Sequence, residues 1–345
     1  MLRRMLKAMV KKYGWKFLIY GGIGKLISLT IFVGLLGHWY GGLLNNEEAV
    51  ATIYLIPGST TEEMLAEVDS AVSRAGGHGD RIARVLWVRG WGDRLKPGKY
   101  ELGGNLTIGE AANTLVTGKR GDVRVVVPSS RDLAVIAGKI AMPIYADSLE
   151  ILRLIEPDSI RWQIIPNTYN MYWETNAEVA VERLLKESKK WWTEDRIAKA
   201  KAQGLTPEEA VILASIVQAE TKSLSEAPTV AGLYLNRLKI GQALQADPTV
   251  IYAVGDASIR RVLREHLVFE SPYNTYLHTG LPPGTIRTPE PTFIEAVLNA
   301  EVHDYLFMCA EPGRTGKHSF AVNFNQHKRN ARKFQRWLNS ENIYR

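Results

Sequence analysis

A long uncharged segment near the N-terminus constrains this chain more than any other feature of its sequence. Residues 26–44 carry no formal charge and consist mainly of Leu, Ile, Val, Phe, Gly and Trp. At about 1.5 Å per residue, a helix of this length approaches the ~30 Å hydrocarbon core of a bilayer. Because the apolar run begins at Phe17, the sequence predicts a single-pass membrane anchor over residues 17–44.

The charges on either side of this segment predict how the anchor is inserted. Glu47 and Glu48 follow the segment, whereas the residues before it are basic and include no acidic side chain. Those basic residues are Arg3, Arg4, Lys7, Lys11, Lys12 and Lys16. Since positive residues stay on the cytoplasmic side, we expect residues 1–16 to be a cytoplasmic tail. The remainder would lie outside the inner (cytoplasmic) membrane, where wall polymers are the available substrates. A cleavable signal peptide is the alternative, but its apolar region would be shorter and followed by small residues.

Composition argues against several classes of function. The formal net charge of +7 invites a nucleic-acid partner, but the excess is concentrated in the N-terminal tail, so none is expected. The only cysteine, Cys309, excludes an intramolecular disulfide and is expected to be a buried thiol. The histidines show no metal-ligand spacing, so the sequence predicts neither a metal site nor another cofactor.

The sequence after the anchor predicts an α+β chain with two domains. Residues 45–128 form a small module, with strands expected at 51–57, 95–102 and 123–128 and helices starting near 60 and 107. Residues 129–345 are richer in helix and are expected to form a second domain, separated by a boundary near 128–143. Its helical patterns are residues 177–190, 206–221, 230–238, 294–299 and 325–337, and a strand is expected at 305–308.

One of these helices carries a carboxylate on an apolar face. Thr206-Pro207-Glu208-Glu209 is a complete helix start, with an N-cap, a proline at the first position and a capping box. Leu213, Ile216, Val217 and Glu220 then share one helix face. Burial would raise the pKa of Glu220, and a glutamate that titrates near neutral pH can act as a general acid and base. A structural ion pair at the helix end explains the same pattern, and periodicity alone does not decide between them.

The loops that follow mix rigid turns with hydrogen-bonding and aromatic side chains, as a carbohydrate cleft does, although rigid loops alone can have this composition. Two segments are concerned, residues 244–252 and 271–284. Asp247 is the obvious second carboxylate, but its place before Pro248 equally suits a turn or a helix cap. The candidate substrate-binding residues are Tyr169, Asn236, Gln245, Asp247, Thr249, Tyr252, Asn274 and Tyr276.

Several ordered blocks resemble the YceG-like family of endolytic murein transglycosylases. They are Ala214-Ser215-Ile216-Val217-Gln218-Ala219-Glu220-Thr221, residues 236–241, residues 244–252, Ser271-Pro272-Tyr273-Asn274-Thr275-Tyr276, Gly280-Leu281-Pro282-Pro283-Gly284 and the region of His318-Ser319-Phe320. The resemblance runs from the anchor to the end of the chain and is strongest over residues 164–330. Any one block would be weak, whereas their order is specific.

This resemblance implies a LysM-like module after the anchor and a catalytic domain related to lytic transglycosylases. Such lyases cleave the MurNAc–GlcNAc β-1,4 bond of peptidoglycan without water, leave a 1,6-anhydroMurNAc end and terminate nascent strands. A single carboxyl group suffices, and the motif places that role on Glu220. The family further implies work alongside peptidoglycan synthases, the penicillin-binding proteins.

Departures from the family pattern sharpen the assignment. The family block often has a glutamate where this chain has Gln218, and an amide cannot be a general acid. The acid role therefore falls on Glu220, with Glu226 as the fallback. Two other functions stay open: a hydrolytic muramidase, which usually needs two carboxylates, and a non-catalytic wall-binding or divisome scaffold protein.

Overall fold

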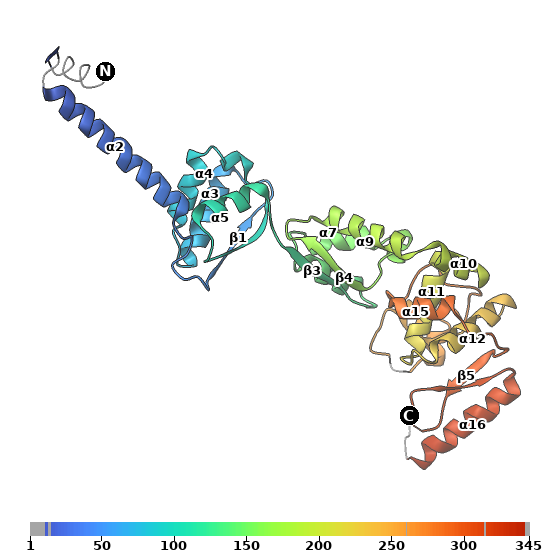
Figure 1. The fold of residues 1–345 in the computed structure, drawn as a ribbon. Coiled ribbons are helices and arrows are strands. Elements are labelled where there is room, and N and C mark those ends of the chain that lie inside the picture. Colours follow the sequence, from blue (N-terminus) through green and yellow to red (C-terminus); the bar gives the residue numbers. More distant parts are fainter. Residues whose placement is uncertain (1–10, 13–14, 260, 314, 342–345) are drawn as a thin grey trace. The chain divides into compact units, whose positions relative to one another are not determined.

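The computed structural model describes residues 11–12, 15–259, 261–313 and 315–341. The chain divides into two compact units: the first ends at Asp122 and includes Tyr172–Glu174, and the second holds Val123–Met171 and the chain from Thr175 onward (Figure 1). The mixed, mostly helical α+β character predicted from the sequence is confirmed. Most of the tail predicted for residues 1–16 lies outside the described residues.

The first unit is built on an antiparallel pair of strands, β1 and β2, whose register runs from Val50↔Gly103 to Leu55↔Gly98. Alternate residues of both strands are buried against α3, α4 and α5, and capping boxes start α3 at Thr60 and α5 at Thr107. The elements are α2 (Trp15–Tyr40), β1 (Val50–Leu55), α3 (Thr61–Arg74), α4 (Gly79–Val88), the 3₁₀ turn η1 (Gly92–Arg94), β2 (Gly98–Gly103) and α5 (Ile108–Thr117).

The C-terminal end of the predicted anchor belongs to this folded unit. Helix α2 ends at Tyr40, and Leu43 and Leu44 are buried in the core of the first unit. The Leu43 backbone N–H donates to the Leu106 carbonyl at 2.9 Å, and Gly42 and Leu44 form β-bridges with Thr107 and Gly77. The predicted boundary at 44 is therefore wrong, because apolarity alone does not separate a membrane segment from the start of a core.

Within the part of the chain that the structure describes, no helix combines the length and hydropathy needed to cross a bilayer. The membrane anchor accordingly stays a prediction.

The second unit has two hydrophobic cores. One lies where β3 and β4 pair and are covered by α6, α7 and α9, and the other lies among α10, α11, α12 and α15. An antiparallel β5–β6 hairpin, packed by α16, follows. The elements are β3 (Asp122–Val127), α6 (Leu133–Ala141), α7 (Ser148–Ile155), α8 (Asp158–Arg161), β4 (Asn167–Tyr172), α9 (Ala177–Trp191), α10 (Glu194–Ala202), α11 (Pro207–Glu220), α12 (Ala227–Lys239), α13 (Asp247–Val254), α14 (Arg264–Leu267), α15 (Pro291–Leu298), β5 (Phe307–Ala310), β6 (His318–Ala321) and α16 (Phe324–Ser340).

Candidate active site

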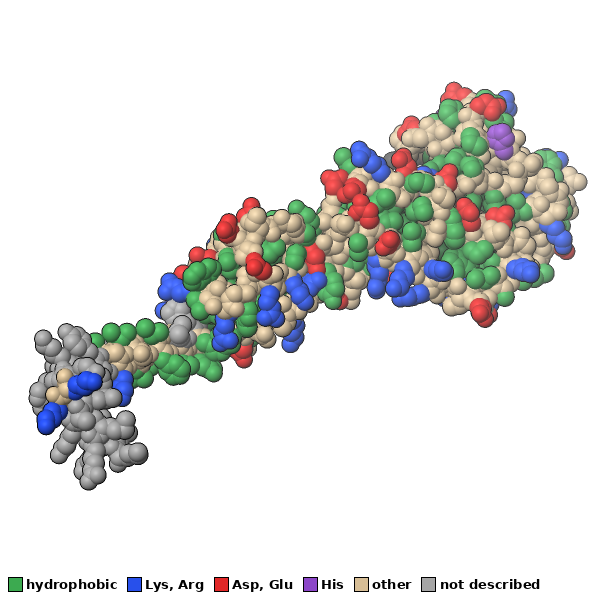
Figure 2. Space-filling model, turned by 90° about the horizontal axis from the view of Figure 1, so that it is seen from above, with side chains coloured by type: hydrophobic (Ala, Val, Ile, Leu, Met, Phe, Trp, Pro, Cys, Tyr) green, Lys and Arg blue, Asp and Glu red, His purple; other side chains and the backbone are tan. Residues whose placement is uncertain are grey.

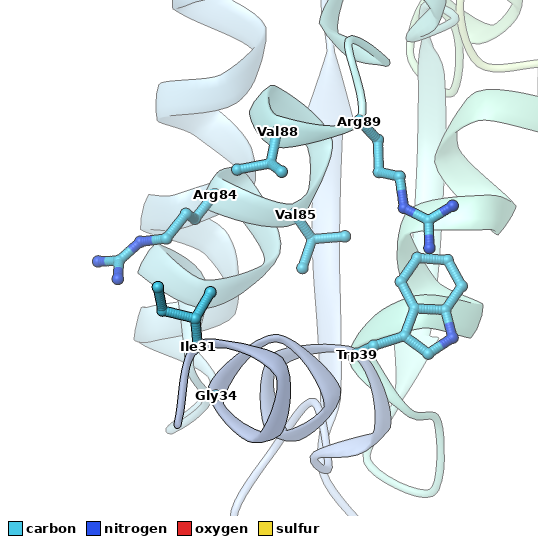
Figure 3. Close-up of a pocket in the computed structure, with 7 residues that line it drawn as sticks. All are labelled: Ile31, Gly34, Trp39, Arg84, Val85, Val88 and Arg89. Carbon is cyan, nitrogen blue, oxygen red and sulfur yellow. The ribbon is translucent and has the colours of Figure 1, made fainter. Parts of the chain in front are cut away.

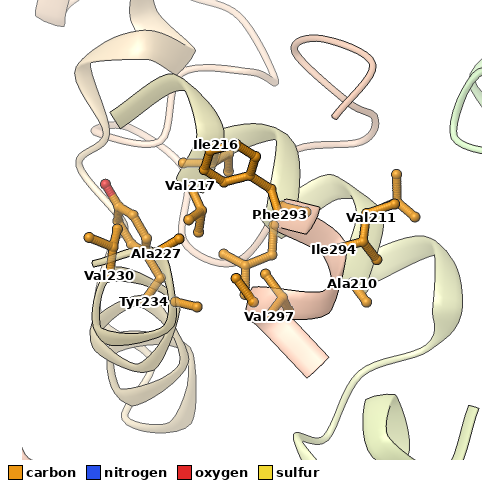
Figure 4. Close-up of a cluster of buried hydrophobic side chains, with 14 of the residues drawn as sticks. Ala210, Val211, Ile216, Val217, Ala227, Val230, Tyr234, Phe293, Ile294 and Val297 are labelled. Carbon is orange, nitrogen blue, oxygen red and sulfur yellow. The ribbon is translucent and has the colours of Figure 1, made fainter. Parts of the chain in front are cut away.

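Helix α11 lies in the core formed with α10, α12 and α15, and it carries Glu220 at its last position. The predicted start is confirmed: Thr206 accepts from the Glu209 backbone N–H, and the Glu209 side chain accepts from the Thr206 N–H. Every residue from Ala210 to Gln218 is buried, against α12 and α15 among others (Figure 4). The helix that positions Glu220 is therefore buried on all sides over this stretch, whereas the sequence pattern predicted only one apolar face.

The Glu220 carboxyl is only partly accessible, and burial raises its pKa to about 7. The nearby Asp247 raises it further, whereas the Tyr234 hydroxyl, His318 and Arg237 favour the charged form and lower the pKa. At neutral pH the side chain is consequently present in both protonation states. This is the condition under which one group both gives and accepts a proton.

Glu220 opens into a cavity of about 290 Å³. Its walls come from the end of α11, one face of α12, the loop before α13 and the β5–β6 hairpin. The lining residues are Glu220, Leu233, Tyr234, Arg237, Leu244, Gln245, Asp247, Tyr276, Met308, Cys309, Ala310 and His318. The buried thiol expected for Cys309 is thus a half-buried wall residue, and burial raises its pKa.

Tyr234 holds the Glu220 carboxyl in place and was not singled out from the sequence. Its hydroxyl donates to Glu220 Oε1 at 2.9 Å, and its ring, which projects from α12, is buried in the core (Figure 4). Burial and the neighbouring Glu220 raise the pKa of this phenol, which keeps it a neutral donor. A tyrosine within the apolar run 230–235 was the available signal, because a buried phenol needs a polar partner.

A second carboxylate, Asp247, lines the same cavity from the first turn of α13 but stays exposed to water. Its Oδ1 accepts from the Tyr276 hydroxyl at 2.6 Å, and burial raises the pKa of that phenol. The cap of α13 is Ala246, which makes no side-chain cap bond, so Asp247 is not the helix cap that the sequence allowed.

The loop that delivers Asp247 is fixed by an unusual backbone. Gln245 has φ of +49°, the only positive value for a non-glycine residue among those described. Its N–H donates to the Thr275 carbonyl, and the Ala246 N–H donates to the Thr275 hydroxyl. A non-glycine residue held in the left-handed region by its surroundings indicates a functional loop.

His318 reaches the cavity from the β5–β6 hairpin and is held by Glu226. The His318 Nδ1 lies 2.9 Å from Glu226 Oε2, and its backbone N–H donates to Glu226 Oε1 at 2.7 Å. Thr221 donates its hydroxyl to the same carboxylate. Glu226 is buried and fully engaged as an acceptor, so the fallback role of general acid does not fit it.

Arg237 joins two walls of the cavity. Its buried guanidinium donates to the Leu306 carbonyl at 2.7 Å, before β5, and to the Leu244 carbonyl at 2.6 Å, in the loop before α13. Burial lowers the pKa of this side chain.

Comparison with known proteins decides the family. A sequence model of the YceG-like family matches residues 53–333. The chain belongs to the YceG-like family. It is 30% identical over 161 residues to the endolytic murein transglycosylase of Bacillus subtilis, covering 47% of this chain and 44% of that protein. It is 29% identical over 171 residues to the protein of the same name from Streptococcus pneumoniae D39, covering 48% of this chain and 31% of that protein.

The chain therefore spans less than half the length of these curated relatives. A crystal structure of a yceG-like protein from Listeria monocytogenes aligns with 82% of this chain and 99% of its own, at 22% identity and a TM-score of 0.49.

Three of the eight substrate-binding candidates line the cavity of this YceG-like chain beside Glu220: Gln245, Asp247 and Tyr276. Two others support those three. Asn274 is buried, donates to the Leu267 and Phe269 carbonyls and accepts from the Tyr276 N–H. Thr249 is buried and hydrogen-bonded to Ala246 and Thr275.

The remaining three candidates lie elsewhere in the second unit. Tyr252 packs on Tyr273 and accepts from Arg161 at 2.8 Å. Asn236 donates to the His303 and Tyr305 carbonyls and lines a different cavity. Tyr169 is a core residue whose hydroxyl donates to the Ile165 carbonyl at 2.6 Å, and burial raises its pKa to about 12. Their sequence blocks hold the fold together and do not bring these side chains to Glu220.

Gln218, where the family often has a glutamate, faces away from the cavity lining. Its Oε1 accepts from the Glu290 backbone N–H at 2.9 Å, so the amide anchors the start of α15 to α11. Among the described residues, no three His, Cys, Asp or Glu side chains gather as metal ligands would.

Proposed function

We propose that this chain is an endolytic lytic transglycosylase, a lyase that cleaves the MurNAc–GlcNAc β-1,4 bond of nascent peptidoglycan strands. The observation that carries this proposal is one carboxyl group, Glu220, with a pKa of about 7 and a phenol donor at 2.9 Å, at the edge of a cavity. The names of the B. subtilis and S. pneumoniae relatives support the same activity.

The reaction needs Glu220 twice. Protonated Glu220 gives its proton to the leaving O4 of GlcNAc as the MurNAc C1–O4 bond breaks. The resulting carboxylate then takes the proton of the MurNAc C6 hydroxyl as O6 bonds to C1, which closes the 1,6-anhydro ring. The proton count balances and no water is consumed, so the enzyme returns to its starting state while strand elongation ends.

Neighbouring side chains stabilise the charges that these steps create. The Tyr234 hydroxyl stabilises the carboxylate formed in the first step, and His318 favours the same charged form. The Asp247 carboxylate, held by Tyr276, faces the cavity where positive charge develops at C1. Gln245 and Tyr276 offer an amide and a phenol to the sugar.

The test is digestion of purified sacculi by the full chain, followed by mass analysis of the glycan ends. We expect 1,6-anhydroMurNAc ends from the native chain and none from Glu220→Gln. Glu182→Gln, an exposed glutamate on α9, is the matched control and keeps full activity. Retained activity of Glu220→Gln would overturn the assignment.

The same digest separates the two other functions. Reducing MurNAc ends would identify a hydrolytic muramidase, whose mechanism needs a second carboxylate such as Asp247. Intact sacculi that nevertheless bind the chain would identify a scaffold protein. The exposed position of Asp247 and the raised pKa of Glu220 favour the single-carboxylate lyase.

The location proposed for this activity follows from the basic N-terminus. We place the anchor, which begins at residue 17, in the inner membrane, with the N-terminus cytoplasmic and the folded part of the chain outside. The order β1-α3-α4-β2 supports a LysM-like, glycan-binding role for the first unit. Nascent strands leave peptidoglycan synthases, and these penicillin-binding proteins are the proposed partners. Protease protection of the N-terminus in sealed vesicles tests the orientation.

A further inference from the structure

Helix α4 exposes apolar side chains on the face that points away from its own core. Ile82, Val85 and Leu86 are buried, whereas Trp87 is 73% and Val88 55% exposed. An exposed tryptophan beside an exposed valine is costly in water. Adjacent exposed apolar side chains of this size mark an interaction surface.

Val88, at one side of this face, borders a hollow against α2. Val85 and Val88 of α4 and Ile31, Gly34 and Trp39 of α2 line a cavity of about 330 Å³ (Figure 3). The exposed side of α2 carries further apolar side chains, visible along the helix in Figure 2. They include Ile27, Leu29, Ile31, Phe32 and Val33.

Two guanidinium groups border the hollow. Arg84 is exposed, points outward from α4 and lies 3.7 Å from the exposed Asp80 carboxylate, and Arg89 lies over the Trp39 ring at 4.4 Å (Figure 3). Residues 80–94 contain four arginines, Arg81, Arg84, Arg89 and Arg94, against two aspartates, Asp80 and Asp93. The surroundings of the apolar face are therefore basic.

We propose that this face of α4 lies in the headgroup region of an anionic phospholipid bilayer. Tryptophan at the level of the headgroups and arginine paired with lipid phosphate are the side chains that interfacial helices use. Trp87 and Val88 enter the boundary of the acyl chains, Arg84 pairs with a phosphate, and acyl carbon fills the hollow against α2. The basic border favours lipid over a second copy of this chain, whose α4 would bring the same positive charges.

The experiment places an environment-sensitive fluorophore on α4 in the full chain. With Cys309→Ser as background, Val88→Cys is labelled with a nitrobenzoxadiazole group. The matched control is Val126→Cys on β3, where the valine is 50% exposed. Both proteins are reconstituted into phosphatidylcholine vesicles with and without phosphatidylglycerol. Acyl-brominated lipids and aqueous iodide serve as quenchers, and flotation reports vesicle association separately.

We expect brominated lipid to quench the label at 88, iodide to leave it bright, and the label at 126 to behave in the opposite way. Brominated phosphatidylglycerol quenches position 88 more than brominated phosphatidylcholine does, and Arg84→Gln abolishes that preference. If the chain floats with the vesicles while iodide quenches both labels, the proposed membrane contact of α4 is wrong, although the membrane anchor is supported. Disulfide cross-linking of two copies through position 88 overturns it in favour of a dimer. Glycan cleavage is a separate readout and depends on neither result.

Discussion

The two carboxyl groups that line the candidate active site differ in their surroundings more than in their chemistry. Glu220 ends a helix buried on every side, whereas Asp247 begins a short helix whose first turn is exposed. Each accepts a hydrogen bond from one phenol: Glu220 from Tyr234 at 2.9 Å, and Asp247 from Tyr276 at 2.6 Å. The two carboxyl groups are therefore similar in their hydrogen bonds to a phenol and differ mainly in burial.

This difference assigns the roles. Burial raises the pKa of Glu220 to about 7, so it can carry a proton at neutral pH. Asp247 meets water and keeps the solvation that stabilises a carboxylate. The same Asp247 charge also raises the pKa of Glu220, so the exposed group tunes the buried one.

The largest expected effect is on turnover. Glu220→Gln keeps the shape of the side chain but removes the proton donor and acceptor. We expect kcat for sacculus cleavage to fall by about 10²–10⁴-fold, the usual contribution of a general acid or base. Circular dichroism should show an unchanged fold, and a tenfold or smaller loss would contradict the acid role.

The same substitution should alter stability with a defined pH dependence. The folded pKa of Glu220, about 7, lies above the unfolded value of 4.5, so its contribution to stability is complete below pH 4.5 and is lost as the pH rises through 7. Relative to the native chain, Glu220→Gln should gain up to about 3 kcal/mol between pH 4 and pH 8. Denaturant titrations at both pH values measure this difference, and a constant offset would show that Glu220 is solvated.

Tyr234→Phe removes the donor that lowers the pKa of Glu220. The pKa should rise, so the alkaline fall of kcat/KM should move upward by about one pH unit, equivalent to about 1.4 kcal/mol. Tyr305→Phe, a half-buried tyrosine outside the cavity lining, is the control. A shift to lower pH would mean that Tyr234 does not donate to the carboxylate.

The smallest effect is expected at the exposed carboxyl group. Asp247→Asn removes a negative charge that raises the pKa of Glu220, so the alkaline limb should move downward, by less than about one pH unit at such an exposed position. Cleavage should persist within about tenfold of the native rate. Complete loss of activity would identify a two-carboxylate mechanism and reverse the ranking of the two groups.

Sequence periodicity identified the elements that carry local signals. The start of α11 at Thr206-Pro207 and the caps of α3 and α5 were predictable because capping boxes are encoded within four residues. Strands β4 and β6 were missed, since each pairs with a partner that only the tertiary fold supplies. The boundary at residue 44 failed because Leu43 and Leu44 enter a core that local hydropathy cannot distinguish from lipid.

The sequence predicted the site residues that lie within the recognised motifs, but it did not predict the neighbours that other segments bring to the cavity. Glu220, Gln245, Asp247 and Tyr276 meet at one cavity as the motifs implied. Their neighbours Tyr234 and His318 reach it from α12 and from the β5–β6 hairpin, segments whose approach depends on long-range packing. Family motifs also mix roles: Asn236 stands in one of the ordered blocks but donates to backbone carbonyls.

The guanidinium of Arg237 limits where this chain can accept insertions. One planar group reaches the carbonyls of Leu244 and Leu306 at the same time, although 62 positions of sequence separate them (306 − 244). A longer loop next to Leu244 or Leu306 would still have to bring that carbonyl to the Arg237 guanidinium. Otherwise the buried cation would lose one of its acceptors. Insertions should therefore be tolerated between residues 255 and 259, away from both contacts and from the Leu267 and Phe269 carbonyls that Asn274 holds, and be selected against within a few residues of 244 or 306. Deep insertional scanning would reveal this as two narrow forbidden windows around a permissive stretch.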